Sequence, residues 1–220
     1  MSVTSALQRL KKNAGYHGWP SAFQLLLVDL LRKFIVLERI HLYSLESLPA
    51  GMEFPGSDRA RLATLDEVKL LAKDPVMDMT EWNEAKLEEL WRDGHRCVLN
   101  LDGAKVVGYS WMRFDRIEIP ALKAGFGLRP DEGYIYKGFT RPDSRGKNVA
   151  NDRFLCWLQY IQKSNRRSAI TYFAFDNKAT LRRVEKLAMR KLGTATRIGI
   201  GRFEKLFRCG DYRSRELYPL

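Results

Sequence analysis

The order of strand-like and helix-like runs after residue 59 places the strongest constraint on how this chain can fold. Residues 60–63 are predicted to form a short strand, 64–72 and 81–94 have helical periodicity, and 96–115 has the pattern of two strands. A strand, a helix, a strand, a helix and a strand pair follow, over residues 133–140, 146–164, 169–175, 177–191 and 195–209. This alternation predicts an α/β fold with a mixed sheet.

Short motifs predict where some of these elements begin and end. Thr64 and Glu67 match the capping box that opens a helix, and Gly94 stands where a glycine commonly ends one. Asp102-Gly103 lies between two strand-like runs, and this dipeptide is typical of a tight hairpin turn.

An amphipathic run precedes these elements. Its apolar side chains recur at helical spacing: Phe23, Leu26, Leu27, Leu30, Phe34 and Leu37. Charged residues from Asp29 onward interrupt the run before it reaches the roughly 20 apolar residues of a membrane span. The first half therefore predicts a helix that packs on the body or on a second subunit, or that lies on a membrane surface or a partner. Residues 36–45 alternate like a strand.

Residues 48–58 contain two prolines and two glycines and are predicted to be a linker. The predicted organisation is an N-terminal extension (1–47), a main domain (59–209) and a C-terminal tail (210–220). The N-terminal residues lack the pattern of a signal peptide, and the three cysteines lack disulfide or zinc spacing. These features favour a cytoplasmic protein, and association with the inner face of the membrane stays open.

The charge balance predicts an anionic partner. The chain has 38 Lys and Arg against 26 Asp and Glu, a net charge of +12. Such a charge attracts nucleotide cofactors, nucleic acid, acidic glycans or a lipid surface, and does not choose among them. The sequence has no zinc-finger, helix-turn-helix or RNA-binding signature, and His17, His41 and His95 lack metal-ligand spacing. We therefore expect no metal and no specific nucleic acid, and structural or surface roles for the histidines.

One stretch, TRPDSRGKNVAND (residues 140–152), lies between a predicted strand and a predicted helix. Backbone N–H groups at a helix start are unpaired, and the helix dipole favours an anion there. Gly146 and Ala150 would let a phosphate approach the backbone, while Arg145 and Lys147 add positive charge. The stretch is consistent with a phosphate cradle and also with an ordinary basic turn.

Two segments, YIYKGFTRPDSRGKNVANDRFLCWL and AITYFAFDNKATLRRVEKLAMRKLG, resemble the GNAT superfamily of acyl-CoA-dependent N-acyltransferases. The resemblance covers roughly Arg59 to Cys209. It implies a mostly antiparallel, twisted mixed sheet flanked by helices, with acetyl-CoA or another acyl-CoA as the donor. The family's loop for the CoA pyrophosphate aligns with Arg145, Gly146, Lys147, Asn148, Val149 and Ala150.

The aligned residues depart from the family pattern at some positions. Asn148 stands where the inner glycine of the loop is usual, and Asn tolerates left-handed backbone geometry better than most residues. Asn177 is implied as a contact to the pantetheine arm of CoA, with Thr180 on the first helical turn. Ala188 and Met189 replace the usual Gly-Phe pair.

The implied reaction is direct attack of an amine on the thioester in a ternary complex. A base or water takes the amine proton, backbone N–H groups polarise the carbonyl, and an acid can protonate the thiolate. Gly138, Phe139 and Thr140 are expected to line the donor. The catalytic candidates stay open: Glu132 or Glu118 as base and Tyr134 or Tyr136 as acid. The alternatives are catalysis mainly by proximity, and tyrosines that are only half-buried strand aromatics.

The acceptor is inferred by a looser resemblance. The N-terminal extension, residues 109–130 and the basic C-terminal strand pair resemble GNAT members associated with bacterial cell-surface polysaccharide assembly. This implies an amino sugar or another small amine. A protein N-terminus or lysine is the alternative acceptor, and a non-catalytic basic binding module on a GNAT-like fold is the alternative to an enzyme. A homodimer and a peripheral membrane contact also stay open.

Overall fold

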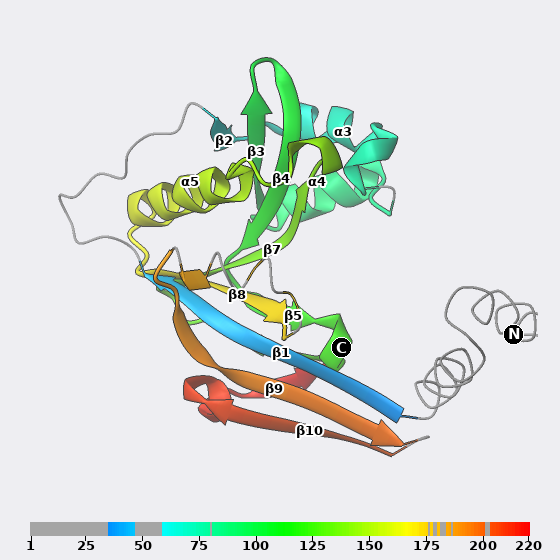
Figure 1. Cartoon of the computed structure of the whole chain (residues 1–220), viewed down its shortest axis with the longest axis vertical. Helices are drawn as coiled ribbons and strands as arrows, with labels where there is room; N and C mark the ends of the chain where they lie inside the picture. The colour runs from blue at the N-terminus through cyan, green and yellow to red at the C-terminus, as the bar shows by residue number, and fades with distance from the viewer. Residues whose placement is uncertain are drawn as a thin grey trace, which may run out of the picture.

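The computed structural model describes residues 35–46, 59–79, 81–175, 177, 180, 184–185, 187–200 and 203–220. Within these residues the fold is α+β, with a large mostly antiparallel sheet, a small second sheet and three α-helices (Figure 1). This confirms the predicted fold class. The predicted amphipathic helix before Ile35 lies outside the described residues.

The large sheet has eight strands in the order β10-β9-β1-β8-β7-β4-β3-β2. The strands are β1 (Ile35–Glu46), β2 (Ala60–Leu62), β3 (Arg96–Asp102), β4 (Lys105–Arg113), β7 (Glu132–Thr140), β8 (Ser168–Ala174), β9 (Arg190–Ile200) and β10 (Phe203–Gly210). Neighbouring strands are antiparallel except β7 and β8, which are parallel. β1 lies between β8 and β9, so part of the predicted extension is an inner strand of this sheet.

The three helices cover both faces of the sheet. α5 (Val149–Lys163) packs Phe154 and Trp157 against Met112 and Ile135. α3 (Leu65–Ala72) and α4 (Glu84–Arg92) pack against Trp111 and its neighbours. Because Trp111 and Met112 are successive strand residues, α5 lies on one face and α3 and α4 lie on the other.

A small sheet that the sequence did not predict has the strand order β11-β6-β5. Its strands are β5 (Arg116–Ile119), β6 (Ala124–Gly127) and β11 (Leu217–Pro219). Ile117 and Phe126 from this sheet pack against Ile40, Leu42 and Ile170 of the large sheet. The small sheet therefore covers β1 and β8, and the chain's last strand is part of it.

The capping box predicted at residue 64 is confirmed. The Thr64 hydroxyl accepts a hydrogen bond from Glu67 N at 3.3 Å, and the Glu67 carboxylate accepts one from Thr64 N at 2.8 Å. The hairpin is also present, but its turn residues are Gly103 and Ala104, because Asp102 still pairs with Lys105. Gly103 has φ +58°, a left-handed conformation that glycine adopts without strain.

The helix predicted over residues 177–191 is too long, because β9 already begins at Arg190. Met189 N donates to Val184 O and Ala188 N donates to Glu185 O, which is the Schellman pattern of a helix end. Ala188 has φ +48° there, so alanine occupies a position that favours glycine. In the part of the chain that the structure describes, no helix combines the length and apolar character needed to span a membrane.

β7 and β8 diverge after a short parallel ladder. Residues 132–134 pair with residues 168–170, and the pairing between these strands ends there. Beyond this point β7 continues along β4, and β8 continues along β1. The large sheet therefore consists of two half-sheets, β2-β3-β4-β7 and β8-β1-β9-β10, which separate toward one end.

Candidate active site

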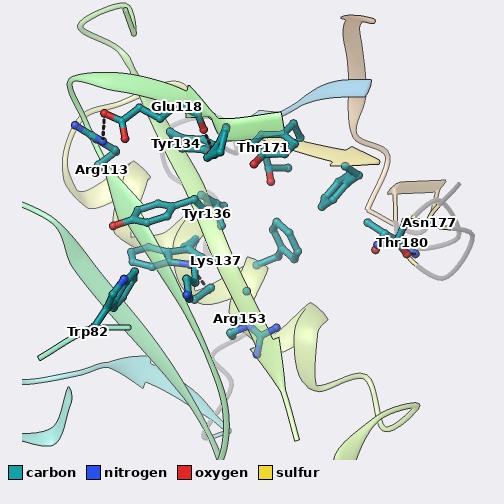
Figure 2. Close-up of a pocket in the computed structure, with 18 residues that line it drawn as sticks. Trp82, Arg113, Glu118, Tyr134, Tyr136, Lys137, Arg153, Thr171, Asn177 and Thr180 are labelled. Atoms are coloured by element: carbon teal, nitrogen blue, oxygen red, sulfur yellow. Dashed lines mark hydrogen bonds and ion pairs between the residues drawn. The ribbon is translucent and has the colours of Figure 1, made fainter. Parts of the chain in front are cut away.

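A cavity of about 610 Å³ opens where β7 and β8 diverge (Figure 2). β7 contributes Tyr134, Ile135 and Tyr136 in succession to its wall. Successive strand residues point to opposite faces, and Ile135 packs with α5 whereas Tyr134 packs with the small sheet. Because residues of both faces line the cavity, it passes through the sheet.

The two ends of the cavity have different walls. We call one end the α5 half, which is lined by Gly138, Arg153, Phe154, Phe173, Asn177 and Thr180. We call the other end the β5 half, which is lined by Trp82, Arg113, Glu118, Tyr134 and Tyr136. Figure 2 shows Asn177 and Thr180 on the opposite side of the view from Arg113 and Glu118.

The loop that precedes α5 has an unusual backbone. Gly146 has φ +81° and Asn148, the N-cap of α5, has φ +61°. A Cβ atom on Gly146 would meet no other atom within 4 Å, so a larger side chain would have room there. The left-handed backbone conformation is what favours glycine at this position. Asn148 makes no side-chain cap hydrogen bond. Asparagine adopts left-handed geometry more readily than most residues, which explains how it replaces a glycine.

The N–H groups of this loop are available to a ligand. Among the described residues, none accepts a hydrogen bond from the N–H groups of residues 146–150. They lie at the N-terminus of a helix of 15 residues, whose dipole favours an anion. Left-handed residues within such a loop turn successive N–H groups toward one concave site. Lys147 and Arg145 are exposed beside it. The loop is therefore suited to bind an anion such as a phosphate.

Arg153 links this loop to the cavity. Its buried guanidinium lines the α5 half, where Nη1 donates to Phe139 O at 2.5 Å and Nη2 donates to Thr140 Oγ1 at 3.2 Å. A Cβ atom on Gly108 would lie 2.5 Å from Arg153 Nη1, so only glycine leaves room for it. Phe139 and Thr140 thus tie β7 to α5 and do not line the cavity, whereas Gly138 does.

β7 has a bulge at the same place. Its register with β4 shifts near residues 136–139, and Lys137 has φ +45°. The Lys137 ammonium forms an ion pair with Glu81 and lies 4.8 Å from the centre of the Trp82 ring. Gly138 lies at this bulge and lines the cavity, beside the part of β7 that does not pair with β8.

Asn177 and Thr180 lie together at the rim of the α5 half. Asn177 Oδ1 accepts a hydrogen bond from Thr180 N at 3.1 Å, so the asparagine side chain caps the turn that follows β8. Thr180 is buried and Asn177 is exposed. The structure thus brings both predicted pantetheine contacts to the cavity.

The β5 half contains an ionic network around the buried Arg113. Arg113 Nε lies 2.6 Å from Asp115 Oδ1, and Arg113 Nη1 lies 3.1 Å from Glu118 Oε1. Arg116 Nε also donates to Glu118 Oε1, at 2.6 Å. Burial alone would raise the pKa of Glu118, but the hydrogen bond from Arg116 and the charge of Arg113 outweigh it and lower that pKa. Glu118 therefore presents a carboxylate to the cavity at neutral pH.

Tyr136 and His95 form a buried pair beside this network. The Tyr136 hydroxyl lies 2.5 Å from His95 Nδ1, and the rings meet edge to face with centroids 5.7 Å apart. Burial and the charge of Arg113 lower the pKa of His95 to about 4, and burial raises the pKa of Tyr136. At neutral pH the pair is a neutral phenol bonded to a neutral imidazole.

Tyr134 is the second tyrosine of the β5 half. Its hydroxyl donates to Glu118 O at 3.1 Å, and its ring stacks on Tyr136 and Tyr172 at centroid distances of 5.5 and 6.2 Å. Burial raises the pKa of Tyr134 well above its usual value. Tyr134 therefore connects β5 to β7 and holds the Tyr136 ring in place.

Glu132 lies outside this cavity, at the start of β7. Its carboxylate oxygens accept hydrogen bonds from Arg215 Nη2 at 2.5 Å and Nη1 at 2.6 Å, and one also accepts from Arg129 N at 2.8 Å. Burial opposes ionisation of Glu132, but the bonds from Arg215 and Arg129 lower its pKa. The geometry ties the C-terminal segment to β7 and gives Glu132 a structural role.

The sequence pattern did not point to Arg113, His95 or Arg153 as parts of the site. His95 acquires its role from Tyr136, which lies 41 positions away. The ionic partners of Arg113, which are Asp115 and Glu118, are near it in sequence, but no pattern marked them as a network. Arg153 had a local signal, because it falls between Ala150 and Trp157 on the buried side of α5. A charged residue at an apolar position of an amphipathic helix indicates a buried cation.

The described residues hold no cluster of three or more His, Cys, Asp or Glu side chains placed to bind a metal ion. The chain matches no protein-family model and no curated protein sequence.

Solved structures do resemble it. A GCN5-related N-acetyltransferase from Sphaerobacter thermophilus matches with a TM-score of 0.52 and 11% identity, over 84% of this chain and 57% of that one. An acetyltransferase of the GNAT family from Colwellia psychrerythraea matches with 0.51 and 10%, over 81% and 61%. A GCN5-related N-acetyltransferase from Kribbella flavida matches with 0.50 and 13%, over 79% and 63%.

The matched region thus spans less than two thirds of each of these three neighbours. At such identities the similarity concerns the fold. The protein has a GNAT-like fold, as its sequence motifs implied.

Proposed function

We propose that the protein is an acyl-CoA-dependent N-acyltransferase, with acetyl-CoA as the simplest donor. The observation that carries this proposal is the cavity through the sheet at the point where β7 and β8 diverge. Unpartnered N–H groups at the start of α5 lie on one side of it, and a carboxylate network lies on the other. The donor and the acceptor can therefore approach each other from opposite faces.

The α5 half is proposed to hold the donor. The N–H groups of residues 146–150, with Arg145 and Lys147, would bind the pyrophosphate. Asn177 and Thr180 at the rim would contact the pantetheine arm. Gly138 lies where the unpaired edge of β7 meets the cavity, so its backbone would polarise the thioester carbonyl.

The chemistry needs a neutral amine and a leaving thiolate. The amine nitrogen forms a bond to the thioester carbon, the carbon–sulfur bond breaks, and the amine proton leaves to a base or to water. The thiolate takes a proton and departs as free CoA. In this proposal the Glu118 carboxylate orients the amine, and the Tyr136 hydroxyl donates a proton to the thiolate. Much of the rate comes from holding the amine close to the thioester.

The β5 half favours a small polar amine as acceptor. The Glu118 carboxylate can attract the acceptor in its ammonium form, before the ammonium group loses a proton. Trp82 supplies an aromatic ring in the same β5 half of the cavity. Carboxylates and an aromatic ring suit an amino sugar, which combines an amine with a ring that stacks on aromatics. A protein amine remains the second candidate, because the chain's acidic and basic surfaces do not distinguish the two.

The test combines binding and turnover. Saturating CoA should raise the melting temperature, because a ligand that binds only the folded state stabilises it. Acetyl-CoA with a panel of amino sugars, polyamines and lysine peptides should then release free thiol with at least one of them. No shift with CoA but a large shift with nucleic acid would support the non-catalytic binding module.

A matched pair of variants locates the activity. Glu118→Gln should keep the CoA-induced shift and slow thiol release about tenfold, while Asn148→Val should weaken the shift itself. Thiol release that persists unchanged in both variants would place the reaction outside this cavity.

A further inference from the structure

The outer ends of β1, β9 and β10 have an exposed apolar surface. Six large side chains, each 41% to 73% exposed, make up what we call the apolar face: Leu37, Phe175, Ile198, Ile200, Phe203 and Phe207. In Figure 1 these strand ends run to the lower right, away from the helices. An exposed apolar patch of this size on a folded protein commonly marks an interaction site.

The strand register puts these side chains on one side of the sheet. Leu37 pairs with Ile198, and Ile200 pairs with Phe203. Directly paired residues of antiparallel strands point to the same face, as do residues two apart on one strand. Phe207 therefore joins them. Phe175 follows β8 and its N–H bonds to Arg39 O, which extends the surface across β1.

The opposite side of the same strands is the core side. Ile40 and Ala195 pack there against the small sheet. Arg197 Nη2 lies 2.7 Å from Glu204 Oε1, and Arg197 Nη1 donates to Ala121 O at 2.7 Å. This side buries its apolar residues and pairs its charges, so the apolar face does not contribute to the core.

Charge is divided between the two sides in the same way. Arg39 and Lys205 fall on the apolar face by the register, and Lys205 Nζ lies 5.3 Å from the centre of the Phe207 ring. Glu38 and Glu204 fall on the core side. Among the described residues of these strands, the apolar face thus combines aliphatic and aromatic side chains with cations and no carboxylate.

We infer that the apolar face is the surface with which this protein binds an anionic lipid bilayer. A flat strand face sets its apolar side chains at one depth, where they enter the boundary between headgroups and acyl chains. Arg39 and Lys205 then meet lipid phosphates, and the chain's net charge of +12 adds long-range attraction. This inference is independent of the acyltransferase proposal.

The same charges argue against a second copy of the chain as the occupant. A two-fold contact through this face would bring the cations of both copies together, with no carboxylate of the described strand faces to offset them.

The experiment is co-sedimentation of the full chain with phosphatidylcholine vesicles, with and without phosphatidylglycerol. We expect binding to the phosphatidylglycerol vesicles that falls as salt is raised, and little binding to phosphatidylcholine alone. Phe203→Ser with Phe207→Ser should lower the partition coefficient about tenfold or more, because two exposed aromatic side chains no longer enter the lipid. Lys205→Glu should lower it on the anionic vesicles.

The matched control is Leu70→Ser with Val76→Ser. These residues are 71% and 43% exposed but lie on α3 and the neighbouring turn, so vesicle binding should not change. Circular dichroism checks that all variants are folded, as expected for exposed positions.

Three results would overturn the inference. The first is equal vesicle binding by the Phe203/Phe207 variant and its control, or no binding by the unaltered chain. The second is loss of all binding in a Leu27→Asp, Leu30→Asp variant while the Phe203/Phe207 variant still binds. The third is a dimer in light scattering that the Phe203/Phe207 variant dissociates, which would make the face a self-association surface.

Discussion

The α5 half and the β5 half of the cavity are built from different chemical groups. The α5 half offers backbone N–H groups, set in place by the left-handed conformations of Gly146 and Asn148. The β5 half offers side chains, with Arg113, Glu118 and Tyr136 brought together from three strands. A site made of backbone N–H groups depends on the identity of few residues. A network of side chains depends on the identity of every residue in it. Donor binding should therefore tolerate sequence change that acceptor chemistry does not.

The largest expected effect concerns a residue that belongs to neither half. Glu132→Ala leaves Arg215 buried without its carboxylate, which should cost about 3–5 kcal/mol of unfolding free energy. CoA affinity of the folded protein should not change. Urea unfolding with a parallel CoA titration measures both. If the Glu132→Ala protein had normal stability but no turnover, Glu132 would be a catalytic residue. The comparison between the α5 half and the β5 half would then be incomplete.

The next effect tests the support of the β5 half. The pKa of His95 is about 4 in the folded protein and near 6.5 when unfolded, so only the unfolded chain gains this proton as pH falls between those values. The stability contribution is complete above pH 6.5 and is lost toward pH 4, by up to about 3 kcal/mol. His95→Gln should flatten this pH dependence. Identical profiles for both proteins, measured by denaturant unfolding, would show that His95 is not buried as a neutral imidazole.

The α5 half can be tested without touching the β5 half. Asn148→Val places a branched residue at φ +61°, and Arg145→Glu adds negative charge beside the phosphates. Each should weaken CoA binding by about 1–3 kcal/mol in calorimetry at fixed salt. Asn148→Gly is the control and should keep or improve affinity. If neither Asn148→Val nor Arg145→Glu changed the affinity for CoA, the loop would be an ordinary basic turn and not a phosphate site.

A smaller effect should appear at the acceptor side. Glu118→Gln should lower kcat/KM for the amine about tenfold, equivalent to about 1.4 kcal/mol, with CoA affinity unchanged. Because the pKa of Glu118 is lowered, its carboxylate is already ionised at neutral pH. The rise of kcat/KM with pH should then follow the pKa of the amine, in the unaltered protein and the variant alike. An inflection near neutral pH that the Glu118→Gln variant loses would instead show that Glu118 itself titrates there, contrary to its lowered pKa.

The smallest effect lies at the helix end that follows Thr180. Ala188→Gly should stabilise the protein by about 0.5–1 kcal/mol, because glycine relieves the left-handed strain at φ +48°. Thermal unfolding measures it, with Ala188→Val as the destabilised counterpart. A loss of stability in the glycine variant would mean that alanine is not strained there.

The same division explains how much the sequence could predict. The order of strands and helices, the Thr64 capping box and the loop before α5 follow from short-range patterns, and the structure contains them. The loop could be predicted because a helix start with Gly146 and Asn148 carries its own geometry. The structure also places Asn177 and Thr180 at the cavity, and their contact with pantetheine stays a prediction.

Other features depend on neighbours that no local pattern contains. The pairing of Tyr136 with His95 joins residues 41 positions apart, and that of Glu132 with Arg215 joins residues 83 positions apart. The small sheet was missed because β5, β6 and β11 are short and one of them comes from the end of the chain. Glu132 was a reasonable candidate by position on the strand, and only the location of Arg215 shows that its charge is already engaged.

The short ladder between β7 and β8 has a mechanical consequence. Among the residues that the structure describes, strand pairing connects the two half-sheets only through residues 132–134 and 168–170, so this short ladder is a hinge between them. A ligand that forms hydrogen bonds to the facing edges of both β7 and β8 would connect the two half-sheets and make their relative position more rigid. Amide exchange in residues 135–138 and 171–173 should then slow when CoA is added, even where the ligand makes no direct contact.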